Sequence, residues 1–546
     1  MPLRTPMAPG REAGPDGTNG VLMTTGKPST AEAGSAGPVV RTASGAVRGR
    51  AEGGLAVFRG IPYARPPVGE ARLASPRPPE PWDGVRDAFS FGPPPVQTPM
   101  PMVPSATAET DAPGGDDWLT VNVWTPEPSA GVRLPVMVWI YGGGYTMGMS
   151  SEYDGARLAR EGEVVLVTLN YRVGFEGFGH IEGAPANRGL LDQISALEWV
   201  RENIAAFGGD PGRVTVFGES AGAGSIAALL AVPRARGLFG RAIAQSVPGT
   251  FLSPDLAADI ASTITSSLGV EATMTDLAAL SPAALAQATG AHIAVSRQYT
   301  RRWGAIADTS MLICPVVDGD VLSEAPWRSV AAGSARQVEL LTGHTRDEFR
   351  FALFLGGLIG RVTEDQARAA LGTLAPAPDG ERAYREAFPD ASAERLYELV
   401  HSDWLFRMPT VHLAEAQAEA GGQAHVYELT WPAPALGGVA GACHGLDVPL
   451  TFGDFTTEFS ATFIGEARDE AEAVSAHFRR AWTSFAKDGH PGWSPYRAPG
   501  RLTRLMDTDT GIAPYANDES RRIWADHAFA AMPLLDPENG SKGAGL

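Results

Sequence analysis

A serine between two glycines is the first candidate for chemistry in this chain. The segment FGESAG, residues 217–222, places Ser220 two residues from Gly218 and two from Gly222. When a G-x-S-x-G sequence forms a sharp turn between a strand and a helix, it presents the serine hydroxyl as a nucleophile for acyl transfer. The chain holds 64 glycines in 546 residues, so a match arises by chance with odds of about one half. The motif alone is therefore weak evidence.

A serine nucleophile also needs backbone donors that stabilise an oxyanion. The segment WIYGGGYTMG, residues 139–148, has three consecutive glycines after an apolar run. Such a loop lets N–H groups face a site, as in the oxyanion loops of lipases and esterases. The alternatives are a flexible turn and a phosphate loop. The phosphate loop fits poorly, because neither Gly-Lys-Ser/Thr nor G-x-G-x-x-G is present in this segment.

A base and an acid must follow in the order serine, acid, histidine. His444, in GACHGLDVPLTFG, comes late in the chain after an apolar run and a glycine-rich loop. The segment TGHTRDEF follows an earlier apolar run and offers Asp347 and Glu348. Taken singly, each of these residues is more often an ordinary loop residue. Their joint occurrence in the required order favours catalysis, while the residues alone leave both acids open.

The elements that would position these residues alternate between strands and helices. Short apolar runs predict strands at 134–141, 164–170, 213–217, 241–246, 338–343 and 425–431. Continuous apolar runs are typical of strands buried on both faces of a largely parallel sheet. Apolar residues at three- and four-residue spacing over 190–204 predict a helix, with Asn187 as its N-cap. This alternation predicts an α/β fold with helices on both faces of the sheet, and Ser220 falls between a strand and a helix.

The remaining segments complete the expected organisation. Residues 39–49 predict an N-terminal hairpin. Two stretches of helical composition, about 253–303 and 352–420, are expected as insertions above the strand ends. We expect a flexible extension over 1–38, one domain over 39–530 and a flexible tail over 531–546.

Composition excludes several classes of function. A hydrophobic fraction of 44% with 19% charged residues fits a globular protein. The net charge of −18 argues against a nucleic-acid partner, because phosphate binding needs a basic surface. No apolar run fits a signal-peptide core or a membrane span, so we expect a cytoplasmic protein. Cys314 and Cys443 lack metal-ligand spacing and are expected to be buried free thiols.

Beyond these residues, the chain resembles the type-B carboxylesterases, the branch of the α/β-hydrolase superfamily that includes carboxylesterases and cholinesterases. The resemblance runs from about residue 39 to 524. It rests on FRGIPYARPPVGEARL, DDWLTVNVW, WIYGGGYTMG, NYRVGFEGF, NRGLLDQISALEWVRENIAAFGGDPGRVTVFGESAG, GHTRDEF, GACHGLDVPLTFG and SFAKDGHPGW. It implies the α/β-hydrolase fold over 39–530, with a mostly parallel central sheet, flanking helices and helical insertions over the active-site cleft.

The resemblance also implies roles for single residues. Ser220 would be the nucleophile, Glu348 rather than Asp347 the acid, and His444 the base. The oxyanion hole would be formed by the N–H groups of Gly143, Gly144 and Ala221. The implied function is hydrolysis of a small-molecule carboxylic ester through an acyl-enzyme on Ser220, with no metal or cofactor. The alternatives are an acyltransferase or lactone-forming enzyme with the same triad, and a non-catalytic cholinesterase-like binding protein.

Several positions depart from the family pattern. The Asp-Glu-Gly stretch continues with Phe349, and the places of a common disulfide hold Val96 and Trp118. The absence of this cysteine pair fits a reducing compartment. Residues 97–117 contain no tryptophan, which disfavours choline esters because cholinesterases hold the quaternary ammonium against one. Tyr145 stands where phenylalanine is common, so its hydroxyl is a candidate to alter the acyl side of the pocket. Glu219, beside the nucleophile, would either charge the base of the pocket or brace the turn.

Overall fold

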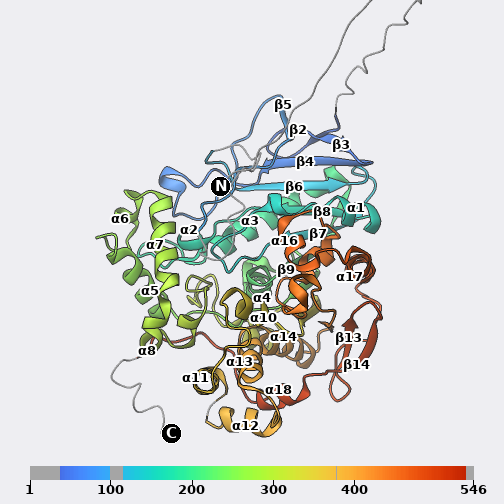
Figure 1. Cartoon of the computed structure of the whole chain (residues 1–546). Coiled ribbons are helices and arrows are strands. Elements are labelled where there is room, and N and C mark those ends of the chain that lie inside the picture. Colours follow the sequence, from blue (N-terminus) through green and yellow to red (C-terminus); the bar gives the residue numbers. More distant parts are fainter. Residues whose placement is uncertain (1–36, 99–114, 377, 536–546) are drawn as a thin grey trace, which may run out of the picture. The chain divides into compact units, whose positions relative to one another are not determined.

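A central sheet organises the described part of the chain (Figure 1). The structure is a computed structural model that describes residues 37–98, 115–376 and 378–535. Eleven strands form the sheet. In spatial order they are β14 (Gly511–Pro514), β13 (Leu502–Met506), β12 (Ala424–Leu429), β11 (Glu339–Thr345), β10 (Arg241–Gln245), β9 (Gly209–Glu219), β7 (Leu134–Ile140), β8 (Val165–Leu169), β6 (Thr120–Thr125), β4 (Leu55–Pro62) and β3 (Arg50–Glu52).

Neighbouring strands from β13 through β8 pair in parallel, and the outer strands pair antiparallel. Helices separate the parallel strands along the chain, and their packing buries both faces of the central strands. In β7, Val136, Met137, Val138 and Trp139 are all fully buried. The mostly parallel α/β sheet predicted from the sequence is confirmed, and β7 to β12 account for the six predicted strands.

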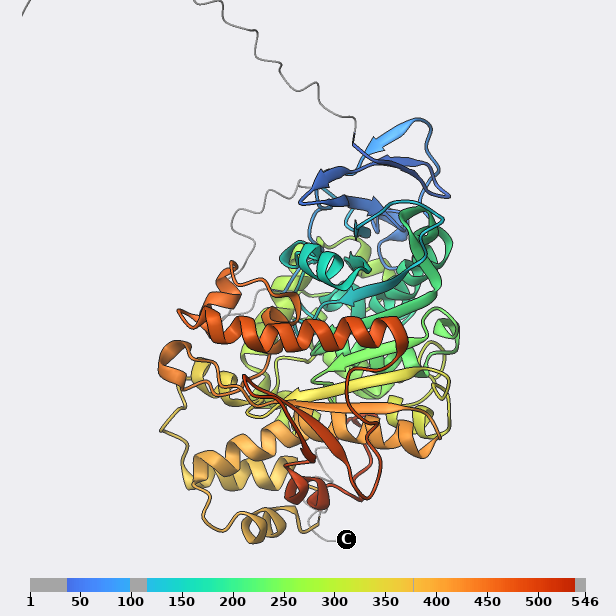
Figure 2. The ribbon, with the colours of Figure 1, turned by 90° about the vertical axis from the view of Figure 1, so that its right-hand side faces the viewer.

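Helices flank this sheet. Three of them pack against strands of the group β9 to β12: α3 (Arg188–Asn203), α4 (Ala221–Ala231) and α14 (Met408–Glu419). The 21-residue helix α17 (Arg468–Asp488) packs on β7, β9 and β13 and lies in front of the sheet in Figure 2. Beside α17 lie α1 (Ala156–Gly162) and α15 (Asp447–Phe452). The predicted hairpin is also present, as β1 (Val39–Arg41) and β2 (Ala46–Arg48), with β5 (Val85–Asp87) beside β2.

Both segments of helical composition are helical. The first contains α5 (Pro254–Ser266), α6 (Met274–Ala278), α7 (Pro282–Ala294) and α8 (Thr300–Trp303). The second contains α10 (Arg350–Leu355), α11 (Glu364–Leu374), α12 (Gly380–Ala387), α13 (Ala393–Ser402), the π-helix η7 (Asp403–Arg407) and α14. It has its own small apolar core, built mainly from α11 and α13. The remaining helices include α2 (Gly174–Phe178), α9 (Pro326–Ala331), α16 (Glu458–Ile464) and α18 (Asp518–Ile523).

Asn187 is the N-cap residue of α3, as predicted, but without a capping hydrogen bond from its side chain. Asn187 has left-handed backbone angles, φ 55° and ψ 37°, and its side chain does not cap the helix. The fully buried amide instead donates to the Val316 carbonyl and accepts from the Val316 N–H, each at 2.8 Å. The Asn187 side chain therefore bonds to the backbone of a distant segment and not to the first turn of α3, where an N-cap side chain would bond.

The predicted terminal extensions, 1–38 and 531–546, lie mostly outside the described residues, so the domain boundaries stay predictions. Both cysteines are buried free thiols, as predicted. No helix in the described part combines the length and the apolar character that crossing a bilayer requires.

Candidate active site

The turn that carries Ser220 joins β9 directly to α4. Ser220 has φ 55° and ψ −124°, outside the ordinary regions for a residue with a side chain. The flanking glycines are needed because the turn packs against β7. A Cβ added at Gly222 would lie 2.0 Å from the Ile140 carbonyl oxygen, and one at Gly218 would lie 2.5 Å from it. The strained strand-to-helix turn predicted from the motif is present.

His444 lies between Ser220 and Glu348. Its Nε2 is 2.9 Å from the Ser220 Oγ, and its Nδ1 is 2.6 Å from the Glu348 Oε2. Ser220 follows β9, Glu348 follows β11, and His444 lies between β12 and α15. Because parallel strands end at the same edge of a sheet, residues 96 and 224 positions apart meet there.

Asp347, the other acid considered, has a different set of partners. Its Oδ2 accepts a hydrogen bond from the Ala442 N–H at 3.0 Å, and its own N–H donates to the Ala442 carbonyl at 2.8 Å. These two bonds fix the loop that leads to His444. Asp347 thus holds the histidine loop, while Glu348 contacts the imidazole.

Ser246 is a site residue that the sequence did not indicate. Its Oγ donates to the Glu348 Oε1 at 2.6 Å, and the Thr345 N–H donates to the same oxygen at 2.8 Å. Ser246 directly follows β10 and has φ 56°. A non-glycine residue with positive φ after a strand is uncommon. No pattern in the segment RAIAQSVPG, residues 241–249, predicts this backbone conformation at Ser246.

The site carries three buried acids around one histidine. Burial raises the pKa of Glu348, but the His444 charge and hydrogen bonds from His444 and Ser246 outweigh it and hold that pKa below its usual value. Burial raises the pKa of Glu219, whose Oε1 lies 3.2 Å from the His444 Nε2. Burial lowers the pKa of His444, and the carboxylates of Glu219 and Glu348 raise it above the ordinary imidazole value. Asp447, also fully buried, acts in the same direction.

The glycine loop after β7 lies against the turn that carries Ser220. A Cβ at Gly142 would be 3.2 Å from the Ser220 Cβ. Gly143 and Gly144 have φ of 96° and 60°, which glycine adopts without strain. Within the described residues, no carbonyl or side chain accepts a hydrogen bond from the N–H groups of Gly143, Gly144 or Ala221. These three N–H groups therefore have no hydrogen-bond partner within that part of the chain.

Tyr145 differs from the expectation. Its side chain is fully buried, with the ring 5.1 Å from the Phe178 ring. The hydroxyl points at α4, where a Cβ on Gly224 would lie 2.0 Å from it. It has no hydrogen-bond partner within the described residues. The hydroxyl therefore packs beneath the turn and does not line the acyl side of a pocket.

Comparison with known proteins identifies the group to which this chain belongs. The model of the carboxylesterase family matches residues 36–501. The chain belongs to the carboxylesterase family. It is 36% identical over 498 residues to the para-nitrobenzyl esterase of Bacillus subtilis strain 168, covering 89% of this chain and 98% of that protein. It is 32% identical to the phenmedipham hydrolase of Pseudarthrobacter oxydans, and the match covers 84% of this chain and 93% of that protein.

Solved structures agree with the family assignment. A Geobacillus stearothermophilus carboxylesterase matches with a TM-score of 0.77 at 33% identity, covering 89% of this chain and 99% of that one. A para-nitrobenzyl esterase structure matches with a TM-score of 0.76 at 36% identity, over the same shares of the two chains. The predicted family and its α/β-hydrolase fold are confirmed.

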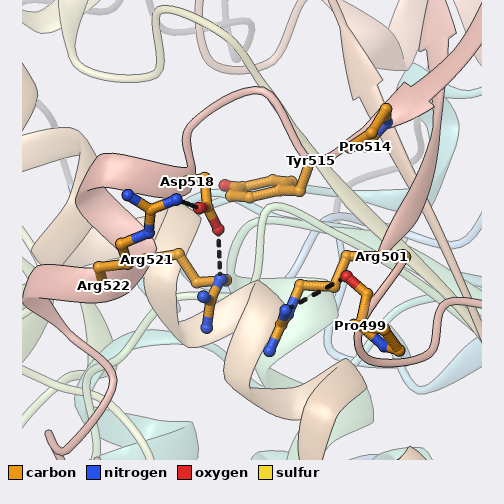
Figure 3. A pocket seen from close by; sticks show the side chains of 8 residues that line it. Pro499, Arg501, Pro514, Tyr515, Asp518, Arg521 and Arg522 are labelled. Atoms are coloured by element: carbon orange, nitrogen blue, oxygen red, sulfur yellow. Dashed lines mark hydrogen bonds and ion pairs between the residues drawn. The ribbon is translucent and has the colours of Figure 1, made fainter.

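A cavity of about 410 Å³ lies apart from Ser220, Glu348 and His444 (Figure 3). Arg501, Arg521 and Arg522 line it, and none of the site residues does. The carboxylate of Asp518 lies between Arg521 and Arg522 in Figure 3 and pairs with both. Asp518 therefore partly neutralises the charges of Arg521 and Arg522. In the described part of the chain, no cluster of three or more His, Cys, Asp or Glu side chains is arranged to hold a metal ion.

Proposed function

We propose that this protein hydrolyses carboxylic esters through an acyl-enzyme formed on Ser220. The observation that carries the proposal is the continuous hydrogen-bonded chain from Glu348 through His444 to Ser220, at 2.6 and 2.9 Å. A serine hydroxyl becomes a useful nucleophile only when a base within hydrogen-bond reach removes its proton. The membership of the chain in the carboxylesterase family supports the ester as the bond attacked.

In the first step, the Ser220 Oγ attacks the ester carbonyl carbon as its proton passes to the His444 Nε2. The C–O bond to the alcohol then breaks, and His444 returns the proton to the leaving alkoxide. In the second step, water gives a proton to His444 and attacks the acyl carbon. The acid leaves and Ser220 regains its proton. Glu348 stays ionised, holds the Nδ1–H tautomer and stabilises the imidazolium.

The negative charge of each tetrahedral intermediate would be held by the N–H groups of Gly143, Gly144 and Ala221. Ala221 is the first residue of α4, so the partial positive charge of that helix end adds to its donor. Removing one donor from such a site typically costs a factor of about 10²–10³ in rate.

Hydrolysis of p-nitrophenyl acetate, butyrate and octanoate, and of p-nitrobenzyl acetate, tests the proposal. We expect turnover by the wild type and its loss in Ser220→Ala, with both proteins melting at similar temperatures. A fluorophosphonate probe should label the wild type on Ser220 and leave Ser220→Ala unlabelled. Equal turnover in both proteins, or a folded wild type that is neither active nor labelled, would overturn it.

A further inference from the structure

The ring of Phe406 covers one face of the His444 imidazole. The two ring centroids are 4.0 Å apart and the ring planes differ by 22°. We propose that Phe406 is a positioning residue, whose stacked ring holds the imidazole in line between Ser220 and Glu348 and stabilises its protonated form during the reaction. This inference rests on the proposed role of His444 as the base.

The backbone around Phe406 is specialised for this placement. Phe406 lies in the five-residue π-helix η7, between α13 and α14. Short π-helical turns are rare and frequently occur at functional sites. Pro409 lacks an N–H, so it cannot bond the carbonyl of Leu405 as an α-helical residue would. That carbonyl instead accepts a hydrogen bond from the Gly249 N–H at 2.9 Å.

This bond connects η7 to the loop that holds the acid. Gly249 lies three residues after Ser246, which donates to Glu348, and Glu348 contacts His444. A closed path of contacts therefore runs from Phe406 through His444, Glu348 and the 246–249 loop back to Leu405. The hydrogen bond from Gly249 thus holds the backbone beside Phe406 against this loop.

Two buried charges anchor the ends of η7. Arg407 and Asp403 pair at 2.8 Å, and both side chains are fully buried. The Tyr384 hydroxyl donates to the Asp403 Oδ2 at 2.6 Å, and Arg407 also donates to the Leu399 carbonyl at 3.3 Å. Breaking a buried pair of this kind is costly, so the π-helix that carries Phe406 is held rigidly.

The polar groups at His444 contact the edge of its ring, while Phe406 contacts its face. Glu348 meets Nδ1, and Ser220 and Glu219 meet Nε2. Asp447, three residues along the chain, adds a negative charge without a direct bond to the ring. The electron-rich face of a phenyl ring attracts a cation more strongly than a neutral ring. Phe406 therefore favours the imidazolium that forms as Ser220 loses its proton.

The test compares Phe406→Leu with Phe239→Leu. The two phenylalanines are 6% and 7% exposed, and Phe239 is part of the main apolar core. Both variants should lose some thermal stability. Only Phe406→Leu should lower kcat/KM, by about three- to tenfold, and move the acid limb of its pH profile down by about half a unit. Phe406→Tyr keeps the ring and should keep the wild-type midpoint. If Phe406→Leu does not fold, Phe406→Met replaces it with the same expectations.

An acid limb that stays at the wild-type pH in Phe406→Leu, with a loss of activity no larger than in Phe239→Leu, would overturn the inference. Failure of the proposed function would look different. In that case the wild type itself would show no acid limb, or His444→Gln would keep wild-type activity.

Discussion

Ser246 and His444 bind opposite oxygens of the same carboxylate. The Ser246 Oγ donates to the Glu348 Oε1 and the His444 Nδ1 lies against Oε2, both at 2.6 Å. One oxygen is thus fixed by Ser246, and the other contacts the His444 imidazole. This arrangement predicts that the Ser246 hydroxyl contributes to the rate through the orientation of Glu348.

Ser246→Ala and Ser246→Gly separate the hydroxyl from the backbone. Both variants lose a hydrogen bond to a charged group, so kcat/KM for p-nitrophenyl butyrate should fall by about tenfold in each. Glycine adopts the φ of 56° more easily than alanine. Ser246→Gly should therefore melt at a higher temperature than Ser246→Ala. Wild-type activity in either variant would contradict the role given to the hydroxyl.

The two neighbouring acids should respond differently to neutral substitution. Glu348→Gln leaves the imidazole without a charged partner and should lower kcat by about 10³–10⁴. Asp347→Asn keeps a side-chain oxygen for the Ala442 N–H, so it should lower kcat by less than about tenfold and lower the melting temperature. Steady-state kinetics and thermal melts on both variants measure this. An Asp347→Asn loss as large as that of Glu348→Gln would show that the roles are misassigned.

The pH dependence of kcat/KM should depend on the charge of Glu219. In the proposed mechanism His444 must be neutral to accept a proton, and the nearby carboxylates raise its pKa. The acid limb of kcat/KM should therefore have its midpoint above about 6.5, the ordinary imidazole value. Glu219→Gln removes one negative charge and should move that midpoint to lower pH. Glu415→Gln is the control. It also removes one carboxylate, but Glu415 pairs with Arg501 and Arg521 and not with His444. A midpoint unmoved by Glu219→Gln, or moved equally by the control, would count against the electrostatic role.

Tyr145 and Gly224 should be energetically coupled. The Tyr145 hydroxyl is buried and lacks a partner within the described residues, so Tyr145→Phe should stabilise the fold by about 1 kcal/mol. Gly224→Ala places a methyl group against that hydroxyl. This variant should destabilise the fold by about 1–3 kcal/mol. In the double variant the destabilisation by Gly224→Ala should be smaller. Urea unfolding of the four proteins measures the coupling, and strictly additive effects would contradict the packing described.

The sequence determined the parts of the site that depend on short segments. The apolar run before FGESAG and the small residues after it predicted the strand-to-helix turn at Ser220. The order of the 347–348 pair and His444 after later apolar runs matched the order serine, acid, histidine of a catalytic triad. In the structure they meet because the parallel strands end at one edge of the sheet. Residues alone left Asp347 and Glu348 open, and the family resemblance indicated Glu348.

The tertiary structure alone decided which residues support that site. Ser246 contacts Glu348 across 102 residues and Phe406 covers His444 from an insertion, and neither position has a local pattern that marks it. Asn187 is a residue type that favours the N-cap position, but its fully buried amide hydrogen-bonds to Val316 and not to the first turn of α3. Sequence periodicity reports which face of an element is buried. It does not report which distant backbone group or aromatic ring occupies that face, because this depends on how the sheet brings separate segments together.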